Sequence, residues 1–118
     1  EGRTSRMGME IPLIDEFSEK YADLKDWQKC GALYHVESVK PGAAGKAGEW
    51  QKLRVTAEGR HVRVHLNGQL VVDADLDSYE EDVYQEHIGL KRDSGYIGLQ
   101  NYGGAPIQFR NIRIRELP

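Results

Sequence analysis

Apolar and polar residues alternate along much of the chain, which is the pattern of half-buried β-strands. The alternation is strongest in the middle, where three runs follow one another at 53–57, 62–66 and 70–74. Turns at Gly59 and Gly68 separate these runs. The pattern therefore predicts three consecutive strands joined by tight turns.

The Asn67-Gly68 turn decides how the second and third runs pair. A two-residue loop would pair Val64 with Val71 and would put the apolar residues of the two strands on opposite faces. A three-residue loop, with Gly68 at positive φ, pairs Val64 with Leu70 and keeps all the apolar residues on one face. We predict the three-residue loop, because a one-residue slip reverses every side chain.

Further stretches bring the expected number of strands to about seven. Pro12 lacks an N–H group, so the strand that contains it lies at an edge or carries a bulge. The apolar positions change parity at Arg110-Asn111, which predicts a β-bulge there. The additional predicted strands are 8–14, 33–36, 95–102 and 107–116.

The remaining stretches read as connections. Residues 15–29 show roughly helical spacing and predict a short helical excursion. Residues 40–48 are a Gly/Ala/Pro loop, and residues 79–90 predict a surface excursion. Short alternating strands with glycine-rich turns and little helix predict an all-β fold, an antiparallel β-sandwich, as one domain over 1–118.

Composition narrows the classes of function. The chain has 118 residues, 16 Lys and Arg against 19 Asp and Glu, and a formal net charge of −3. Phosphate-backbone binders carry a basic patch, so we predict no nucleic-acid partner. No apolar run approaches the roughly 18 residues of a membrane-spanning helix, so we predict no membrane span. The single cysteine, Cys30, excludes an internal disulfide and reads as a buried, inert thiol.

The motifs in the sequence that could bind a metal or a cofactor are incomplete, so we predict no metal and no cofactor. The Asp73-x-Asp75-x-Asp77 run lacks the glycine and the final glutamate of a calcium loop. His61 and His65 lie on a predicted strand and share a face with arginine, which repels a cation. An exposed polar face explains them better, and the sequence contains no phosphate loop or dinucleotide fingerprint.

Two groups of side chains suit carbohydrate chemistry. Glu10 and Asp15 lie at the predicted strand 8–14 and its end, and carboxylates serve as acid, base or nucleophile in glycosidic-bond chemistry. Each could equally be a surface carboxylate. Aromatic and amide groups on a sheet face suit sugar recognition, although a half-exposed face is the alternative. They are Tyr96, Gln100 and Tyr102, with Trp27 and Tyr34 as a possible rim.

Five blocks resemble, in order, a bacterial family, the 3-keto-disaccharide hydrolase-like domain. They are GMEIPLID (8–15), EKYADLKDWQKCGALY (19–34), GEWQKLRVTAEGRHVRVHLNGQLVVDADL (48–76), GLKRDSGYIGLQNYGG (89–104) and FRNIRIREL (109–117). The resemblance implies a concanavalin-like jelly roll of two antiparallel sheets. It also implies hydrolysis of 3-keto-glycosides through proton abstraction at C2, and a secreted or periplasmic location.

The resemblance carries over to particular residues. Glu10 and Asp15 match the family's strand carboxylates. The matching positions on the sheet face or its rim are Tyr34, Lys91, Arg92 and Gln100. The family usually has Gln where this chain has Pro12, and commonly has His where this chain has Tyr102. Loss of that imidazole removes a natural acid or base.

The family's opening strands precede the block matched at residue 8. We therefore expect this chain to correspond to the C-terminal two-thirds of a jelly roll, with a second chain as one candidate to complete it. The leading hypothesis is a glycoside hydrolase-like domain in which Glu10 or Asp15 is the base. Lys91 or Arg92 would stabilise the enolate oxygen, and Tyr34, Gln100 and Tyr102 would hold the sugar. The alternatives are a non-catalytic carbohydrate-binding module and a structural or interaction domain.

Overall fold

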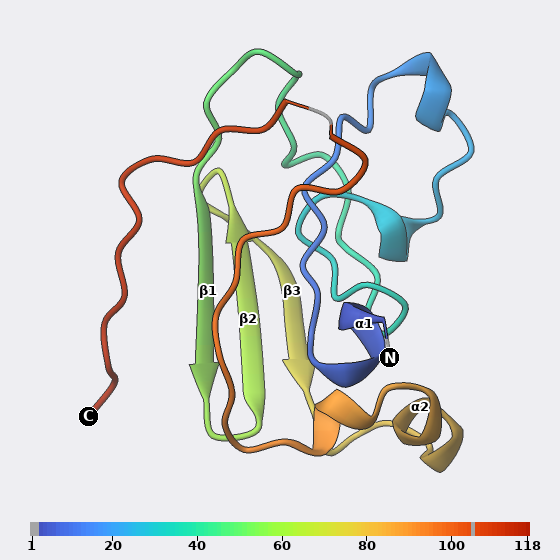
Figure 1. The fold of residues 1–118 in the computed structure, drawn as a ribbon, viewed down its shortest axis with the longest axis vertical. Helices are drawn as coiled ribbons and strands as arrows, with labels where there is room; N and C mark the ends of the chain where they lie inside the picture. The colour runs from blue at the N-terminus through green and yellow to red at the C-terminus, as the bar shows by residue number, and fades with distance from the viewer. Residues whose placement is uncertain (1–2, 105) are drawn as a thin grey trace.

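A three-stranded antiparallel sheet organises the chain in the computed structural model, which describes residues 3–104 and 106–118 (Figure 1). The strands follow the order β1-β2-β3, which confirms the three central strands that the alternation predicts. They are β1 (Leu53–Glu58), β2 (His61–Leu66) and β3 (Gln69–Asp75). The helical segments are α1 (Thr4–Met7), η1 (Glu19–Tyr21), η2 (Asp26–Gln28), α2 (Glu81–Glu86) and η3 (Ile88–Lys91).

The turn between β2 and β3 differs from the prediction. Leu66 pairs with Gln69, so the loop has two residues and the predicted three-residue loop is wrong. Asn67 and Gly68 both have positive φ, 51° and 82°. Two successive residues in this region form the I′ type of turn, whose twist matches that of the strands it joins.

A bulge inside β3 restores the common apolar face. Val64 pairs with Val72 and Val62 pairs with Ala74, so Val71 is the additional residue on β3. Val71 and Val72 are both buried. The sheet therefore keeps its aliphatic residues together through a strand bulge instead of a longer loop.

The core lies on one face of β2 and β3 and is covered by the segment that precedes β1. The main-chain N–H of Lys40 donates to the carbonyl of Val71 at 2.9 Å, which fastens this segment along β3. The buried apolar residues are Cys30, Ala32, Leu33, Val39, Ala43, Val62, Val64, Leu66, Val71, Val72, Ala74, Leu76 and Leu90. Cys30 is a free, buried thiol, as predicted.

The predicted strand 8–14 is an extended segment without a regular ladder. It lies antiparallel to residues 30–34, because Gly31 N–H donates to the carbonyl of Pro12 at 3.0 Å and Tyr34 N–H donates to that of Glu10 at 2.9 Å. Pro12 has no N–H to return, which leaves the ladder incomplete. Residues 33–36 form a turn closed by a single bridge between Leu33 and Glu37, so the predicted strand there is wrong.

The connections contain short helices. Residues 15–29 hold the two 3-10 helices η1 and η2. Residues 79–90, predicted as a surface excursion, hold α2 and most of η3. The last residues of this stretch are buried: His87 and Leu90 are 4% and 1% exposed.

The predicted strands 95–102 and 107–116 do not form strands among the described residues. Ile97 and Ile114 are 79% and 73% exposed, and Figure 1 shows the final segment running down the β1 side of the molecule without joining the sheet. Asn111, at the predicted bulge, has a left-handed φ of 55°, so the chain does kink where the parity changes. Within the described ranges the structure is a β fold with one sheet, and the second sheet of a sandwich is not formed.

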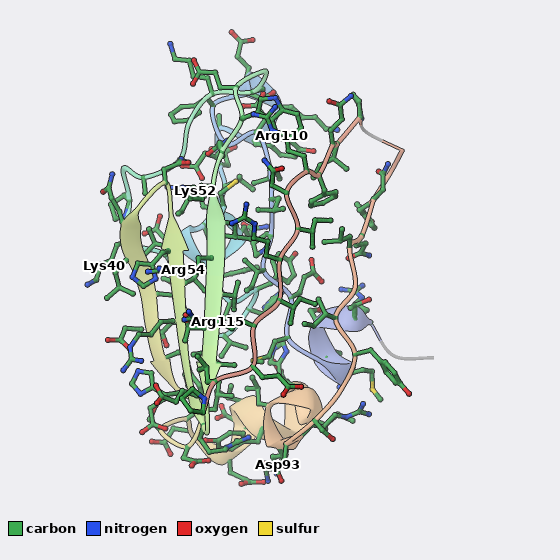
Figure 2. The ribbon with its side chains drawn as sticks, turned by 90° about the vertical axis from the view of Figure 1, so that its left-hand side faces the viewer. Lys40, Lys52, Arg54, Asp93, Arg110 and Arg115 are labelled. Atoms are coloured by element: carbon green, nitrogen blue, oxygen red, sulfur yellow. The ribbon has the colours of Figure 1, made fainter. Side chains whose placement is uncertain are left out.

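The outer side of β1 is rich in positive charge. Figure 2 shows Lys52 and Arg54 on this side of the sheet. The guanidinium of Arg110 lies 3.8 Å from the centre of the Trp50 ring, a cation–π contact. Through this contact the C-terminal segment packs against the loop before β1.

Candidate functional site

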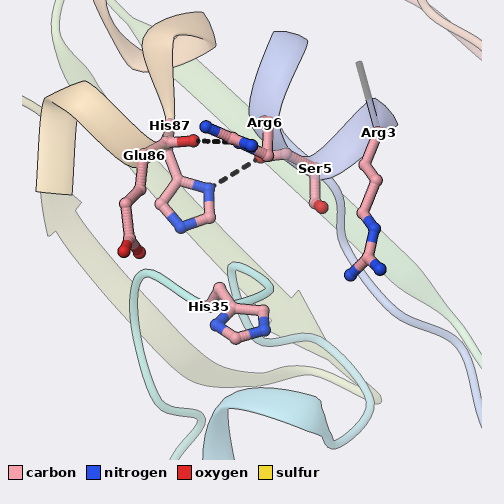
Figure 3. A pocket seen from close by; sticks show the side chains of 6 residues that line it. All are labelled: Arg3, Ser5, Arg6, His35, Glu86 and His87. Atoms are coloured by element: carbon pink, nitrogen blue, oxygen red, sulfur yellow. Dashed lines mark hydrogen bonds between the residues drawn. The ribbon is translucent and has the colours of Figure 1, made fainter. Parts of the chain in front are cut away.

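Three segments far apart in sequence enclose a hollow of about 250 Å³ (Figure 3). They are α1 with the residue before it, the turn after Leu33, and the end of α2. The lining residues are Arg3, Ser5, Arg6, His35, Glu86 and His87. The hollow therefore contains groups that can transfer a proton or stabilise a charge. They are two imidazoles, two guanidiniums and a carboxylate.

His87 is held in one orientation. Its side chain is buried, and its Nδ1 lies 3.0 Å from the carbonyl oxygen of Ser5. A carbonyl oxygen can only accept, so Nδ1 carries a proton. Nε2 is then the nitrogen that gains and loses a proton, and Figure 3 shows it directed toward His35.

A second bond joins α1 to α2 beside the hollow. The Nε of Arg6 donates to the carbonyl of Glu86 at 2.8 Å. Gly89 in η3 lies directly against the backbone of Met7 and Gly8, where a Cβ would have no room. These contacts fix the wall that carries Ser5 and His87.

His35 forms the opposite wall in a left-handed backbone conformation, with φ 66°. Non-glycine residues adopt this conformation at a cost and persist there only when their surroundings hold them. The His35 ring lies on that of Trp27, with centroids 3.9 Å apart, and faces His87 at 5.8 Å. Partial burial lowers the pKa of His35, with repulsion from His87 as the next cause, so His35 is a neutral imidazole at pH 7.

The predicted sugar-binding residue Tyr34 lies beside this hollow. Its ring meets Trp27 edge-on at 5.2 Å and His35 at 5.0 Å. Its N–H donates to the carbonyl of Glu10, so the structure brings two of the predicted site residues together. The main chain of the half-buried Glu10 therefore adjoins Tyr34, a member of the aromatic cluster of Trp27, Tyr34 and His35.

Asp15 lies further along the same extended segment. Its exposed carboxylate accepts from Phe17 N–H at 3.3 Å and closes its own turn. Five residues of extended chain span up to about 16 Å, whereas paired glycosidase carboxylates are separated by about 5–10 Å. Of the two residues, Glu10 is the one whose main chain is bonded to Tyr34.

Lys91 and Arg92 lie at the end of η3 and are exposed. The Nζ of Lys91 lies 3.2 Å from the carboxylate of Glu81 and 5.1 Å from the centre of the Tyr84 ring. Neither residue is among those that line the hollow.

Gln100 and Tyr102 lie on the exposed segment 95–102. Tyr102 is 87% exposed. Among the described residues, no hydrogen bond or ring contact joins either side chain to Glu10 or Tyr34. The structure thus separates these two predicted residues from the aromatic cluster.

The residues of the hollow were not identified from the sequence. His35 and His87 are separated by 52 positions, and neither belongs to a spaced motif. In residues 3–104 and 106–118, no group of three or more His, Cys, Asp or Glu is arranged to hold a metal ion.

A second hollow offers less chemistry. It measures about 230 Å³ and is lined by Lys52, Arg54, His65 and Gly68. Cationic side chains dominate this lining. On the outer face of the sheet, His61 and Arg63 pair with Asp73, and the bond from His61 lowers the pKa of that carboxyl. This cluster is an exposed ion-pair group, which agrees with the polar face that the sequence predicts.

Comparisons with known proteins point to one family. Residues 1–115 match the family described as the 3-keto-alpha-glucoside-1,2-lyase-like domain. No curated protein matches the chain.

Two crystal structures from Parabacteroides distasonis ATCC 8503, each named "Putative glycosyl hydrolase", are similar to this chain. The first is 33% identical, with a TM-score of 0.57 over 60% of this chain. The second is 26% identical, with a TM-score of 0.49 over 64% of this chain. The chain spans 36% of the length of each. None of the described helices has the length and apolar character needed to cross a membrane.

Proposed function

The chain belongs to the 3-keto-alpha-glucoside-1,2-lyase-like domain family, and we propose that it acts on 3-keto-glycosides or related sugars. The family and the similar structures support a glycosyl hydrolase-like domain. The observation that carries the finer proposal is the placement of Glu10. Its carboxylate belongs to a segment bonded directly to Tyr34, whose ring packs in the aromatic cluster beside the hollow.

A single base is sufficient for this chemistry. The carbonyl at C3 of the sugar acidifies the proton at C2, which the Glu10 carboxylate removes. The electron pair of the C2–H bond moves into an enolate, whose oxygen a cation, Lys91 or Arg92, stabilises. The enolate expels the aglycone from C1, restores the C3 carbonyl and closes a C1=C2 double bond. Water then adds, its hydroxyl to C1 and its hydrogen to C2, and yields the free 3-keto sugar.

The sugar is held by aromatic and amide side chains. Tyr34 offers a ring beside Glu10, and aromatic faces suit the C–H surfaces of sugars. Gln100 and Tyr102 are exposed, and they contribute if segment 95–102 closes over the sugar. The secreted or periplasmic location implied by the sequence resemblance stays a prediction.

Matched amide substitutions test the base. Glu10→Gln removes the base without a change of shape, and release of aglycone from a 3-keto-glucoside should fall by about 10²–10⁴-fold. Asp15→Asn, made on the same segment, should stay within a few-fold of the unmodified protein. Unchanged turnover in Glu10→Gln would contradict the role of Glu10 as the base. A loss confined to Asp15→Asn would identify Asp15 as the base instead.

We also propose that the fold is completed as an antiparallel sandwich of the jelly-roll type. Segments 95–102 and 107–116 have the alternation of strands, yet their apolar side chains are exposed. Pairing with further strands, for example from a second chain, would cover them. A row of unpaired backbone groups with alternating apolar side chains is suited to that pairing.

A carbohydrate-binding module is the second candidate. Tyr96 and Tyr102 are 106% and 87% exposed, and such uncovered aromatic rings suit sugar stacking. Titration with glucosides, with and without oxidation at C3, separates the two candidates. Binding without release of aglycone supports the module.

A further inference from the structure

We propose that His87 is the general acid of this site, the group that protonates the glycosidic oxygen as the aglycone leaves. The inference rests on the proposed function and extends it to a residue outside the sequence resemblance. It rests on three features of the hollow: a fixed exchanging nitrogen on His87, an electrostatic setting that disfavours a charge on His35, and a turn that joins His35 to Tyr34 and so to the segment of Glu10.

The exchanging nitrogen is fixed by the main chain. The carbonyl of Ser5 accepts from Nδ1 at 3.0 Å, whether the ring is charged or neutral. Protonation and deprotonation therefore both occur at Nε2, which points into the hollow (Figure 3). The ring needs no rotation and no change of tautomer to give up its proton.

The charged neighbours of His87 surround it on every side of the hollow. Arg3 and Arg6 face it from the α1 side, His35 from the opposite turn, and Glu86 from its own helix. Burial lowers the pKa of His35, and repulsion from His87 lowers it further, whereas Glu86 raises it. This setting disfavours a positive charge on His35.

The turn that holds Tyr34 and His35 connects the segment of Glu10 to the hollow. Glu10 is bonded through its carbonyl to Tyr34, and the next residue, His35, faces His87 with ring centroids 5.8 Å apart. A sugar held over Tyr34 can therefore present C2 toward Glu10 and its C1 oxygen toward the hollow. A group that gives a proton assists the departure of a poor leaving group, in addition to the base that takes the C2 proton.

The proton balance is complete. Glu10 gains the C2 proton, and the C2–H electron pair passes through the enolate into the C1=C2 bond. The C1–O electron pair leaves with the aglycone oxygen, which takes the proton from Nε2 of His87. Exchange with water returns His87 to its protonated form and Glu10 to its carboxylate. The step consumes no oxidant or reductant.

The dependence on the leaving group tests this role. In His87→Asn the amide nitrogen can still donate to the Ser5 carbonyl, so the wall is kept and the acid is lost. With a methyl 3-keto-glucoside, whose alkoxide needs a proton, the rate should fall by at least about 100-fold. With a 4-nitrophenyl 3-keto-glucoside, whose phenolate leaves unprotonated, the rate should fall by no more than a few-fold. His65→Asn, a matched histidine outside the hollow, should leave both rates unchanged.

The outcomes separate the two proposals. Equal losses of His87→Asn on both substrates would mean a structural role and would overturn the general acid. If the unmodified protein releases neither aglycone, both the proposed function and the general-acid role of His87 are contradicted. Nitrogen-15 NMR of the unmodified protein gives a readout that needs no variant. It should show Nδ1 protonated throughout the His87 titration, and a neutral ring protonated at Nε2 would contradict the proposal.

Discussion

At the scale of single residues, the hydroxyl of Tyr79 fastens the segment after β3 to Glu37, and the hydroxyl of Tyr84 holds that segment together internally. Tyr79 Oη donates to the Glu37 carboxylate at 2.8 Å, and Tyr84 Oη donates to the Leu76 carbonyl at 2.7 Å. Tyr84 Oη also accepts from the N–H of Tyr79 at 3.1 Å. Burial, followed by the bond to Glu37, raises the pKa of Tyr79 well above its ordinary value. The hydroxyl therefore stays protonated and keeps donating across the neutral range.

Removal of this hydroxyl should weaken the fold. Because the acceptor is a carboxylate, Tyr79→Phe should lower the free energy of unfolding by about 1–2 kcal/mol, measured by urea denaturation. Tyr96→Phe, at a fully exposed ring, should change it by less than about 0.5 kcal/mol. Equal stability of the two variants would show that the Tyr79–Glu37 bond contributes nothing.

Residue types alone predicted some residues of the candidate site and missed others. Glu10, Tyr34 and Trp27 were predicted because carboxylates and aromatics suit sugar chemistry; the structure bonds the main chain of Glu10 to Tyr34 and packs the ring of Tyr34 against Trp27, while their role stays a prediction. His35 and His87 were not identifiable. Their meeting depends on a left-handed turn and on a helix end that no spacing in the sequence shows.

At the scale of elements, alternation predicted β2 and β3 because their apolar side chains lie on one buried face. The same alternation predicted β1, although its side chains are exposed or only partly buried in the structure. The loop type was missed because a bulge in the strand and a longer loop have the same effect on which side chains share a face. The sequence pattern indicates which side chains share a face of the sheet, but not whether a bulge or a longer loop puts them there. Asn67, which accepts a positive φ, was the local signal for the two-residue turn.

The β2–β3 turn provides a prediction at this scale. The Asn67 side chain donates to the Ala43 carbonyl at 2.9 Å and accepts from Lys52 N–H at 2.9 Å. Asn67→Ala loses these bonds and adds the strain of a left-handed alanine, so it should lower the free energy of unfolding by about 2–3 kcal/mol. Asn67→Gly loses the bonds but keeps the backbone conformation, and should lower it by about 1–2 kcal/mol.

Thermal and urea unfolding of this pair measure the two contributions separately. The difference between the variants reports the backbone conformation, and the loss in Asn67→Gly reports the side-chain bonds. A glycine variant as unstable as the alanine variant would contradict a left-handed requirement at this position.

At the scale of the whole molecule, the chain divides into a packed part and two uncovered segments. Residues 95–102 and 107–116 carry strand-like alternation, but a strand needs a neighbour, and the sequence pattern cannot show whether one is present. Leu99 and Ile112 are exposed in this structure, and the side chains of β2 that face the core are buried.

Amide hydrogen exchange, followed by mass spectrometry, tests whether these segments accept partner strands. At low protein concentration, 95–102 and 107–116 should exchange rapidly and β2 slowly. At high concentration the two segments should become protected, while β2 stays the same, because association covers their edges. Exchange that is independent of concentration would contradict completion by a second copy of this chain.

The central claim is that this chain removes the C2 proton of a 3-keto-glycoside, and exchange of that proton with solvent measures the step itself. Proton NMR of a 3-keto-glucoside in D₂O should show the C2 signal disappearing faster with the protein than without it. The Glu10→Gln variant should match the solution without protein, even where elimination is too slow to detect. A C2 signal that persists equally with the unmodified protein, its variant and no protein would contradict the account.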